Sequence, residues 1–351
     1  MKDYLFVLGR DPELSLAEIE SYLQSRKYDF RVKEYNKKIA LVSINNLNEK
    51  IINELGGTVK IAEVFNIKDL DYNQDSIKIG FSIYGNKNLK ETQEAVKKYL
   101  KEQKIKVIIK KPKQGEFFSP SENKKDFIEF VIYNNYIART ILVSNPLEYI
   151  KRDSKPYFDR LKITSIRLTK ILITLSGIKE NEDLLDPFCG TGTIMQEALL
   201  MGINSYGIEK DFKTYEGCKQ NLKWLEKNYK IKNKYDIFYG DAREASKFIK
   251  KVDCIVTEPY LGPFLTRIPD EDKANHIKNE LTRLYFDSLK ELKQIARKKI
   301  VFISPVLPFR KGSTKPDMEG ILSKLNIKIE NKLVYRSKGN IIDREIYVLS
   351  P

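Results

Sequence analysis

The second half of the chain repeats one pattern, in which a short apolar run ends in a polar or acidic residue and helix-compatible sequence follows. The first run, "DLLDPF", leads into the turn "CGTGT" and the helical stretch "IMQEALLMG". The later runs are "NSYGIEKD", "YDIFYGDA", "CIVTEP" and "KIVFISPV". Strands that alternate with helices predict a doubly wound, mostly parallel α/β sheet. Such sheets bind their ligands beyond the carboxyl ends of the strands.

The residues at these strand ends predict the kind of ligand. Two glycines, Gly190 and Gly192, let the backbone approach a ligand closely, but Met195 replaces the third glycine of a dinucleotide fingerprint. Asp186, Glu209 and Asp241 end three successive strands. S-adenosylmethionine fits these carboxylates better than a pyrophosphate does, with its amine at Asp186, its ribose at Glu209 and its adenine amine at Asp241. The alternative, that the three acids only cap helices, stays open.

Length and composition set the broad class. A chain of 351 residues favours two domains, and a hydrophobic share of 41% excludes general disorder. No apolar run approaches the roughly 20 residues that cross a bilayer, and "MKDYLFVLGRDPELS" resembles a first strand more than a secretory signal. We therefore expect a soluble, cytoplasmic protein without a membrane partner.

The net charge of +15 favours a polyanionic partner such as nucleic acid, although a general bias toward lysine would give the same value. The segment from Lys97 to Lys113 contains eight lysines and one glutamate. It favours a phosphate-facing surface over a plain solvated helix, because the charge continues through a strand. Lys110, Lys111 and Lys113 are the candidate RNA contacts in it.

Cysteine and histidine usage excludes several chemistries. Cys189, Cys218 and Cys254 have no metal-ligand spacing, so we expect free thiols and no metal site. The single histidine, His276, lies in the polar stretch "EDKANHIKNEL", where a surface position is favoured over a catalytic triad.

The first half predicts a separate α/β region that extends to about Ser144. The strand "YLFVLG" precedes a helix that Ser15 and Glu18 would start as a capping box. A second helix is expected from Leu47 to Gly56, and "FIEFVIYNNYIARTILVS" predicts a hairpin. The strand "SIKIGFSIYG", the helix "NLKETQEAVKKYL" and the strand "IKVIIK" lie between them.

The stretch from Asn145 to Arg160, "NPLEYIKRDSKPYFDR", has two prolines and no clear periodicity, which predicts a linker. Arg152, Lys155 and Arg160, beside its aromatic residues, are candidate contacts to RNA phosphates. A linker that packs its aromatic residues on a neighbouring domain is an equal alternative.

The motif "LLDPFCGTGTIMQEA" resembles the first motif of the class I S-adenosylmethionine-dependent methyltransferases. More narrowly, the chain resembles the THUMP-domain tRNA guanine-N2-methyltransferases that act on guanosine 10. The narrower resemblance rests on "YLFVLGRDPELSLAEIESYL", "GGTVKIAEV", "YIKRDSKPYFDR" and "REIYVLS". It implies a Rossmann-like methyltransferase domain with a mostly parallel seven-stranded sheet, and tRNA as the partner.

The resemblance also implies roles for the stretch "VTEPYLGPF" from Val256 to Phe264. The family has Asp or Asn, Pro, Pro and an aromatic residue here, so Thr257 and Glu258 depart from its pattern. Glu258 is the expected acceptor of the amine hydrogens, because the Thr257 hydroxyl is a weaker acceptor. Pro259 would stiffen the turn and Tyr260 would stack on the base. A buried Glu258 paired with a lysine is the structural alternative. The stretch "LGPFLTRIPDEDK" is expected to form a substrate lid.

The domain and site predictions are as follows. Residues 1–145 form a ferredoxin-like, THUMP-containing RNA-binding region, 146–162 a linker, and 163–351 the methyltransferase domain. The cofactor-binding residues are Asp186, Pro187, Phe188, Gly190, Thr191, Gly192, Glu209, Asp241 and Ala242, and the catalytic residues are Thr257, Glu258, Pro259 and Tyr260.

The expected reaction is methylation of the exocyclic N2 amine of a tRNA guanosine, at position 10, with a small activating protein subunit as a further partner. A methyltransferase for another tRNA or rRNA guanine or a DNA adenine, and a non-catalytic RNA-binding protein, are the alternatives.

Overall fold

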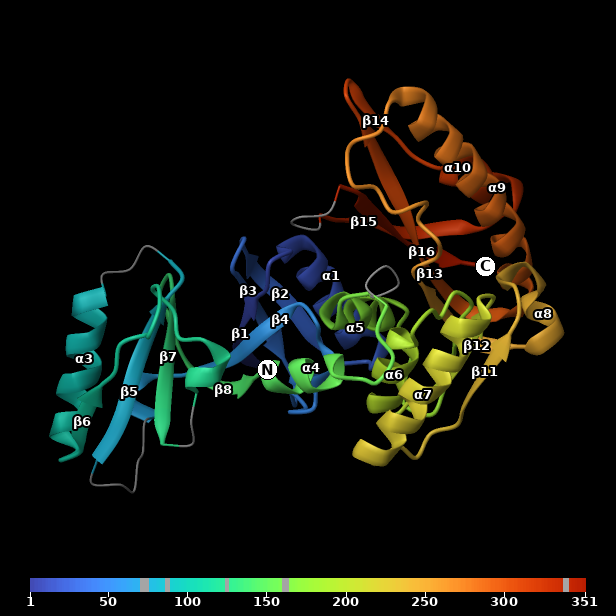
Figure 1. Ribbon diagram of the computed structural model, residues 1–351. Helices are drawn as coiled ribbons and strands as arrows, with labels where there is room; N and C mark the ends of the chain where they lie inside the picture. The colour runs from blue at the N-terminus through green and yellow to red at the C-terminus, as the bar shows by residue number, and fades with distance from the viewer. Residues whose placement is uncertain (70–75, 86–88, 124–125, 160–163, 337–340) are drawn as a thin grey trace. The chain divides into compact units, whose positions relative to one another are not determined.

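The structure is a computed structural model that describes residues 1–69, 76–85, 89–123, 126–159, 164–336 and 341–351. The chain divides into two compact units, one of residues 1–16 and 27–151 and the other of residues 17–26 and 152–351. The division falls at 151/152, a few residues beyond the predicted end of the first domain at 145. Both units are α/β, as the sequence predicts (Figure 1).

The first unit is built on one sheet with the strand order β2-β3-β1-β4-β8-β7-β5-β6. Its strands are β1 (Lys2–Leu8), β2 (Phe30–Tyr35), β3 (Ile39–Ile44), β4 (Thr58–Val64), β5 (Ser76–Ile83), β6 (Lys106–Ile109), β7 (Phe127–Tyr133) and β8 (Tyr136–Val143). Its helices are α1 (Pro12–Ser25, shared with the second unit), α2 (Ile51–Glu54) and α3 (Leu89–Glu102). Strand β5 pairs in parallel with β6 and β7, and α3 covers the face of β5 and β7 (Figure 1).

A buried ion pair lies inside the first unit. Lys60 on β4 contacts the Glu129 carboxylate on β7 at 2.6 and 2.8 Å, and both side chains are fully buried. Ser82, Asn123 and Thr140 also donate to Glu129. A buried carboxylate that collects this many donors holds the surrounding strands and the 117–123 segment in one arrangement.

Three local predictions for the first half and the linker are wrong. Helix α1 begins at Pro12, so Ser15 lies inside it and donates its hydroxyl to Asp11 O at 2.8 Å instead of capping the helix. Helix α2 is a single turn, because Asn48 Oδ1 accepts the Lys50 N–H at 3.0 Å and competes with an earlier helical start. The linker contains the helix α4 (Pro146–Asp153).

The physical reason for α4 is visible in the sequence. Pro146 occupies the first helical position, where its missing N–H costs nothing, and Asn145 Oδ1 accepts the Leu147 N–H at 3.2 Å. The two prolines and the missing periodicity predicted a linker, although a proline at the first helical position is also compatible with a helix.

The second unit carries the strand order β11-β10-β9-β12-β13-β16-β15, and β14 pairs only with β13. Its strands are β9 (Asp183–Asp186), β10 (Asn204–Glu209), β11 (Tyr235–Tyr239), β12 (Val252–Thr257), β13 (Ala296–Phe309), β14 (Gly312–Thr314), β15 (Lys328–Tyr335) and β16 (Asp343–Ser350). Its helices are α5 (Ile166–Leu175), α6 (Thr193–Leu200), α7 (Phe212–Asn228), α8 (Ala245–Phe248), α9 (Glu271–Ile295) and α10 (Met318–Lys324).

The sheet of the second unit is mixed. Strands β11, β10, β9, β12 and β13 pair in parallel, whereas β14, β15 and β16 pair antiparallel. The prediction of a mostly parallel sheet is confirmed, but the count of seven omitted β14. That strand is three residues long and follows β13 after a tight turn, so it has no separate apolar run to find.

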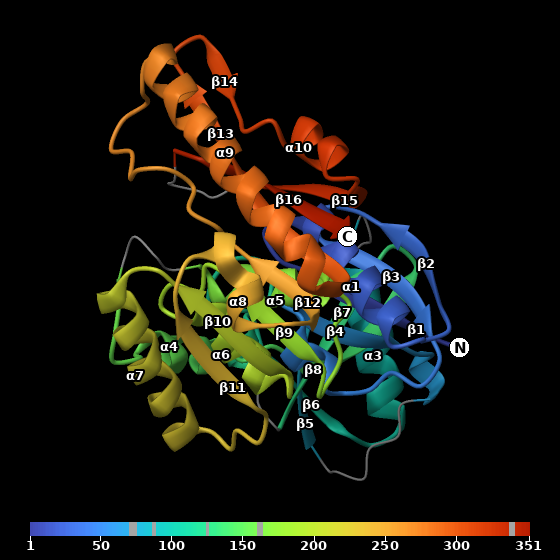
Figure 2. The ribbon, with the colours of Figure 1, turned by 90° about the vertical axis from the view of Figure 1, so that its right-hand side faces the viewer.

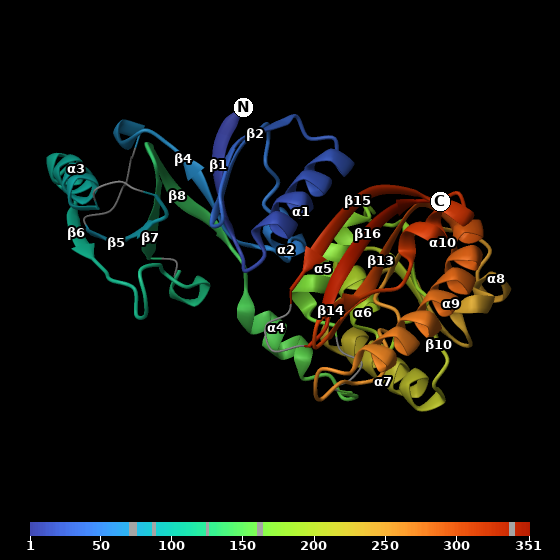
Figure 3. The same cartoon turned by 90° about the horizontal axis from the view of Figure 1, so that it is seen from above.

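Helices cover both faces of this sheet. One core cluster joins α9 and α10 to the strands, and another joins α6 and α7 to them. Figure 2 shows the 25-residue helix α9 running along the sheet, and Figure 3 shows α5 and α6 on one side of β13 and β16, with α9 and α10 on the other. Because each parallel crossover is a helix, the carboxyl ends of β9 to β12 are left open at one edge.

Several further expectations can be compared with the structure. All three cysteines are free and buried, and His276 is exposed with Nε2 3.4 Å from Glu280 Oε1, as expected. No group of three metal-ligating side chains gathers within the described ranges. None of the helices in the described part of the chain combines the length and apolarity that a bilayer crossing requires.

Candidate active site

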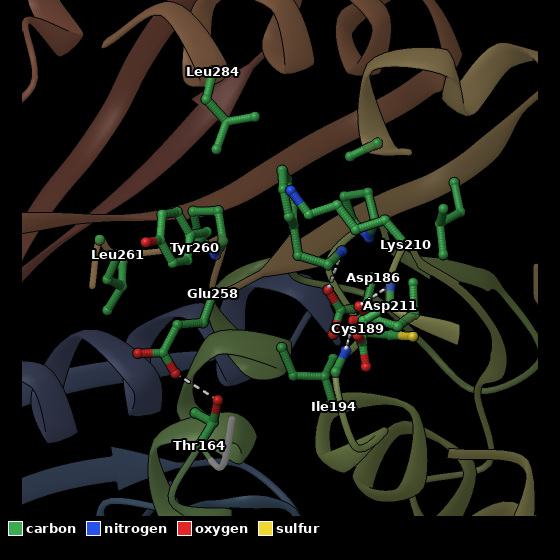
Figure 4. A pocket seen from close by; sticks show the side chains of 18 of the residues that line it. Thr164, Asp186, Cys189, Ile194, Lys210, Asp211, Glu258, Tyr260, Leu261 and Leu284 are labelled. Atoms are coloured by element: carbon green, nitrogen blue, oxygen red, sulfur yellow. Dashed lines mark hydrogen bonds between the residues drawn. The ribbon is translucent and has the colours of Figure 1, made fainter. Parts of the chain in front are cut away.

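A pocket of about 860 Å³ opens at the carboxyl ends of β9, β10 and β12 (Figure 4). The predicted site residues that line it are Asp186, Pro187, Phe188, Gly190, Glu209, Asp241, Ala242, Glu258, Pro259 and Tyr260. Asp186 and Tyr260, which are 74 positions apart, reach the same cavity because parallel strands end at the same edge. Most of the predicted site therefore lies around one cavity.

The glycine turn between β9 and α6 shapes one wall. Gly190 has φ 52° and Gly192 has φ 83°, conformations that residues with a side chain rarely adopt. A Cβ on Gly192 would lie 2.5 Å from Cys218 Sγ on α7. Thr191 and Gly192 do not line the pocket themselves. They bring α6 close to α7 and so determine where the start of α6 meets the cavity.

Asp186 lies at the floor of the pocket and is only 2% exposed. Its Oδ1 accepts the Thr257 hydroxyl at 2.7 Å and the Phe188 N–H at 3.1 Å. Burial raises the pKa of Asp186 to about 7, and the negative charges of Glu209 and Glu258 add to this, while the two hydrogen bonds oppose it. A buried carboxylate with such a raised pKa is suited to receive a cationic group.

Glu209 and Asp241 supply two further carboxylates. Glu209 Oε2 accepts the Gly190 N–H at 3.0 Å and Oε1 accepts the Asp211 N–H at 2.8 Å, so the carboxylate links two strand ends. Asp241 lies two residues beyond the end of β11, which stops at Tyr239, and it pairs with Arg243 at 2.8 Å. The hydrogen bond from Arg243 lowers the pKa of Asp241.

Thr257 and Glu258 end β12 but face different surroundings. Thr257 is fully buried and donates its hydroxyl to Asp186, so it lies beneath the pocket and does not line it. Its hydroxyl oxygen keeps lone pairs that can accept a hydrogen, but this oxygen is buried and does not face the cavity. The catalytic role of Thr257 stays a prediction.

Glu258 does line the pocket, and two residues that were not predicted from the sequence hold it. Arg344 on β16 donates its Nε–H to Glu258 Oε1 at 2.6 Å. The Thr164 hydroxyl donates to Oε2 at 2.5 Å (Figure 4). The structural alternative was a buried Glu258 paired with a lysine. Glu258 does pair with a cation, but that cation is Arg344. The sequence analysis interpreted "REIYVLS" only as a last strand. Its first residue, Arg344, precedes the apolar run and was the one sequence feature that could have indicated a cationic partner for Glu258.

Tyr260 is 51% exposed at the rim, and the Tyr285 hydroxyl donates to its backbone carbonyl at 2.8 Å. This bond holds the backbone of Tyr260, and its exposed ring is accessible, as a stacking surface requires. The predicted lid begins with irregular backbone from Leu261, and Leu261 to Thr266 line the pocket. Closure of this segment stays a prediction.

The predicted RNA contacts separate into two groups. Lys110, Lys111 and Lys113 are exposed after β6 in the first unit. Arg152 points inward to Glu197 at 3.1 Å, and Lys155 is only 6% exposed, with Nζ 2.8 Å from Thr193 Oγ1. A phosphate contact by Lys155 is therefore wrong, because its ammonium lies inside the second unit. Arg160 lies outside the described residues.

The residues around the pocket fit S-adenosylmethionine. The donor set offers carboxylates to an ammonium, to a ribose diol and to an adenine amine, and the glycine turn leaves room for close approach. The turn from Pro187 to Thr193 contains no Lys or Arg that could pair with a pyrophosphate. The cofactor prediction therefore agrees with the chemistry of the site.

Comparison with known proteins gives consistent results. Residues 161–307 match the UPF0020 family model, described as an RMKL-like methyltransferase domain. The tRNA (guanine(10)-N2)-dimethyltransferase of Methanothermobacter thermautotrophicus is 28% identical over 72% of this chain and 75% of its own. The enzyme of the same name from Methanocaldococcus jannaschii is 30% identical over 38% of this chain and 39% of its own.

Among solved structures, TrmN from Thermus thermophilus superimposes with a TM-score of 0.52 at 13% identity, over 99% of both chains. At that identity the likeness concerns the fold alone. The pocket, the match of residues 161–307 to the RMKL-like methyltransferase domain model and the similarity to these two relatives agree with one another. The chain is an S-adenosylmethionine-dependent methyltransferase that is similar in sequence to the tRNA (guanine(10)-N2)-dimethyltransferases.

Proposed function

We propose that this protein methylates the exocyclic N2 amine of a guanosine in tRNA, and that the target is guanosine 10. The observation that carries the proposal is the single pocket in which three carboxylates suited to the cofactor lie beside Glu258 and the accessible ring of Tyr260. The activity for which the relatives from Methanothermobacter thermautotrophicus and Methanocaldococcus jannaschii are named supports the choice of tRNA and of the N2 amine.

Bound S-adenosylmethionine supplies a methyl group made electrophilic by the sulfonium. The chain's contribution is to hold a weak nucleophile, since the lone pair of the guanine amine is delocalised into the ring. Glu258 accepts the amine hydrogens and so favours a more tetrahedral nitrogen. Arg344 and Thr164 donate to its two oxygens, which fixes the direction of the carboxylate. Positioning of this kind contributes a large part of enzymatic rate gains.

Tyr260 and Pro259 position the base. A guanosine in a folded RNA must leave its stack to reach a pocket, and an exposed ring anchored through its backbone offers a new stacking surface. The amine loses one proton after the methyl group is transferred. Glu258, at the mouth of the pocket, offers the first acceptor for that proton, and solvent at the rim receives it next.

The first unit would bind the tRNA. Its exposed Lys110, Lys111 and Lys113 and the chain's net charge of +15 suit phosphate contacts. We propose that residues 1–145 act as the THUMP-containing RNA-binding region and that a small protein subunit activates the enzyme. The boundaries of the linker, 146–162, belong to the same proposal.

The test uses purified protein, methyl-labelled S-adenosylmethionine and unmodified tRNA transcripts, followed by nuclease mapping of the label. A matched transcript carries inosine at position 10 and so lacks only the N2 amine. We expect label in N2-methylguanosine or its dimethyl form at position 10, and none there with inosine. Label at another guanine or at an adenine would support the alternative targets. Cofactor binding without transfer to any RNA, with or without a partner subunit, would contradict the enzymatic role.

A further inference from the structure

One exposed aromatic ring at the mouth of the pocket has no part in the reaction described above. Phe264 lines the pocket and is 71% exposed, more than any other large hydrophobic side chain in the described ranges. Tyr260 and Ile268, in the same segment, are 51% and 54% exposed. Single exposed apolar residues are ordinary on protein surfaces, but three within nine positions, two of them at the entrance of one cavity, indicate a binding surface.

The backbone that carries Phe264 is held against the rest of the second unit. Gly262 has φ 101°, and a Cβ there would lie 2.8 Å from the Ile277 side chain on α9, so the absence of a side chain lets the chain pass close to that helix. Leu265, on the other side of Phe264, packs against the core cluster that contains α9. Pro269 is buried again. The ring of Phe264 is therefore presented to solvent by a segment that is packed on both sides of it.

The exposed ring is suited to a flat apolar partner. Water solvates an aromatic ring poorly, so Phe264 gains free energy when another surface covers it. Arg267, three positions later, is exposed and forms no ion pair within the described part of the chain. An aromatic ring beside an available cation suits nucleic acid, whose bases offer flat faces and whose phosphates offer negative charge.

A guanosine that enters the pocket leaves a gap in its RNA. Enzymes that act on a stacked base extract the nucleotide, and the loss of stacking and pairing costs free energy. Proteins that open a duplex commonly insert an apolar side chain such as Phe between its bases. A ring in the gap replaces part of the lost stacking and hinders the return of the extracted base.

We propose that Phe264 is a wedge that enters the RNA stack in the place of the extracted guanosine. The inference rests on the proposed function, in which a tRNA guanosine enters the pocket. Tyr260 stacks on the extracted base, and Phe264, four positions later, fills the gap that this base leaves. Phe264 touches the RNA and not the reacting atoms, so it is a positioning residue. Arg267 contacts a phosphate beside the gap.

A lid over the cofactor is the alternative role for the same ring. A lid shields every ligand of the pocket from water, so the loss of Phe264 would weaken the binding of S-adenosylhomocysteine. A wedge acts on the RNA alone, so its loss leaves cofactor binding intact. A wedge also matters less when the target base is already unpaired, because such a base costs less free energy to extract.

The experiment measures single-turnover methyl transfer to two tRNA transcripts, one with the target guanosine paired and one with a mismatch opposite it. In Phe264→Ala we expect the rate on the paired transcript to fall about tenfold to hundredfold, and the rate on the mismatched transcript to fall less than about threefold. Phe264→Trp should keep most of the rate on both. Phe212→Ala removes an aromatic ring that is 59% exposed and does not line the pocket, and it is the matched control.

A second measurement follows the extraction itself. A paired transcript with 2-aminopurine at the target position keeps the amine at C2, and its fluorescence rises when the base leaves its stack. With S-adenosylhomocysteine bound, we expect wild type to raise this fluorescence and Phe264→Ala to raise it less. The Kd of S-adenosylhomocysteine, measured by calorimetry, should be the same for both proteins within about twofold.

Each outcome separates the wedge from another role. Equal losses of rate on the two transcripts would overturn the proposal in favour of a general RNA contact. Weaker binding of S-adenosylhomocysteine to Phe264→Ala would overturn it in favour of a lid, and an unchanged rate on the paired transcript would exclude both roles. Wild-type protein that transfers no methyl group to the target guanosine of either transcript would instead contradict the proposed function.

Discussion

Arg344 on the last strand of the sheet donates its Nε–H to Glu258 at the end of β12, across 86 positions of the chain. Both side chains are largely buried, at 16% and 10% exposure. The carboxylate that faces the substrate half of the pocket is thus oriented by a residue far away in the sequence.

Replacing Arg344 should impair transfer more than cofactor binding. In Arg344→Met, Glu258 loses its charged donor and its direction, and we expect the single-turnover rate on tRNA to fall about tenfold to hundredfold. The Kd of S-adenosylhomocysteine should change less than about threefold, since Arg344 does not contact Asp186 or Glu209 in the described structure. Arg344→Lys keeps the charge but not the Nε geometry and should recover only part of the rate. Equal losses in rate and affinity would show that Arg344 stabilises the whole pocket.

The Glu258 carboxylate can be tested with an amide of the same shape. Glu258→Gln keeps one acceptor oxygen but loses the charge, and the amide NH₂ would face a donor, either Arg344 or Thr164. We expect the transfer rate to fall at least tenfold while the protein stays folded. Thr164→Val, which removes only one donor to Glu258, should give a smaller loss. Normal transfer by Glu258→Gln would exclude the role proposed for this carboxylate.

Cofactor affinity should depend on the charge of Asp186. The pKa of this buried carboxyl is raised to about 7, so it is protonated below that pH and receives the cofactor's ammonium poorly. We expect the affinity for S-adenosylhomocysteine to rise between about pH 6 and pH 8 and then level off, with a slope of up to tenfold per pH unit on the acid side. Calorimetry across this range checks it. In Asp186→Asn the affinity should be low and the slope absent.

The carboxyl group of Asp186 should also make protein stability depend on pH, and in the opposite direction to cofactor affinity. Between its ordinary pKa of 3.8 and about 7, the folded protein without ligand keeps a proton that the unfolded chain releases. The contribution of Asp186 to the free energy of unfolding therefore falls as the pH rises through this window. Comparison of wild type with Asp186→Asn in denaturant titrations isolates that contribution.

The buried Lys60–Glu129 ion pair in the first unit predicts that removing one charge destabilises the protein more than removing both. Lys60→Met leaves the Glu129 carboxylate buried without its cation, which typically costs about 3 to 5 kcal/mol. Lys60→Met combined with Glu129→Gln removes the charge as well and should recover part of that loss. Urea unfolding monitored by far-UV circular dichroism measures both. A double variant less stable than Lys60→Met would contradict this account of the pair.

The sequence predicted the cofactor half of the site better than the substrate half. Asp186, Glu209 and Asp241 could be found because each follows a short apolar run, and parallel strands bring such ends together whatever their separation in sequence. Arg344 and Thr164 follow no such rule. Their proximity to Glu258 depends on the antiparallel register of β16 against β13 and on the path of the chain before α5.

Charge in the sequence was also a poor guide to exposure. Lys155 and Arg152 lie in a polar stretch with two prolines, which favoured a surface linker, yet α4 and the contacts with α6 turn both inward. A single sequence does not distinguish a lysine that meets solvent from one that lies behind a threonine of a packed helix. The contact of Lys155 with Thr193, inside the second unit, keeps its ammonium away from an RNA phosphate.

The glycine turn offers a last test, because two separable penalties meet at Gly192. Its φ of 83° disfavours a side chain, and a Cβ there would lie 2.5 Å from Cys218 Sγ. In Gly192→Ala we expect the free energy of unfolding to fall by roughly 2 to 4 kcal/mol, from the left-handed backbone and the overlap together. Adding Cys218→Ala removes the overlap but not the backbone penalty, so a double-mutant cycle should show a favourable coupling of about 1 kcal/mol or more. Cys218→Ala alone provides the baseline. Strict additivity would mean that α7 moves away without cost, and then the turn would not be held by the packing described here.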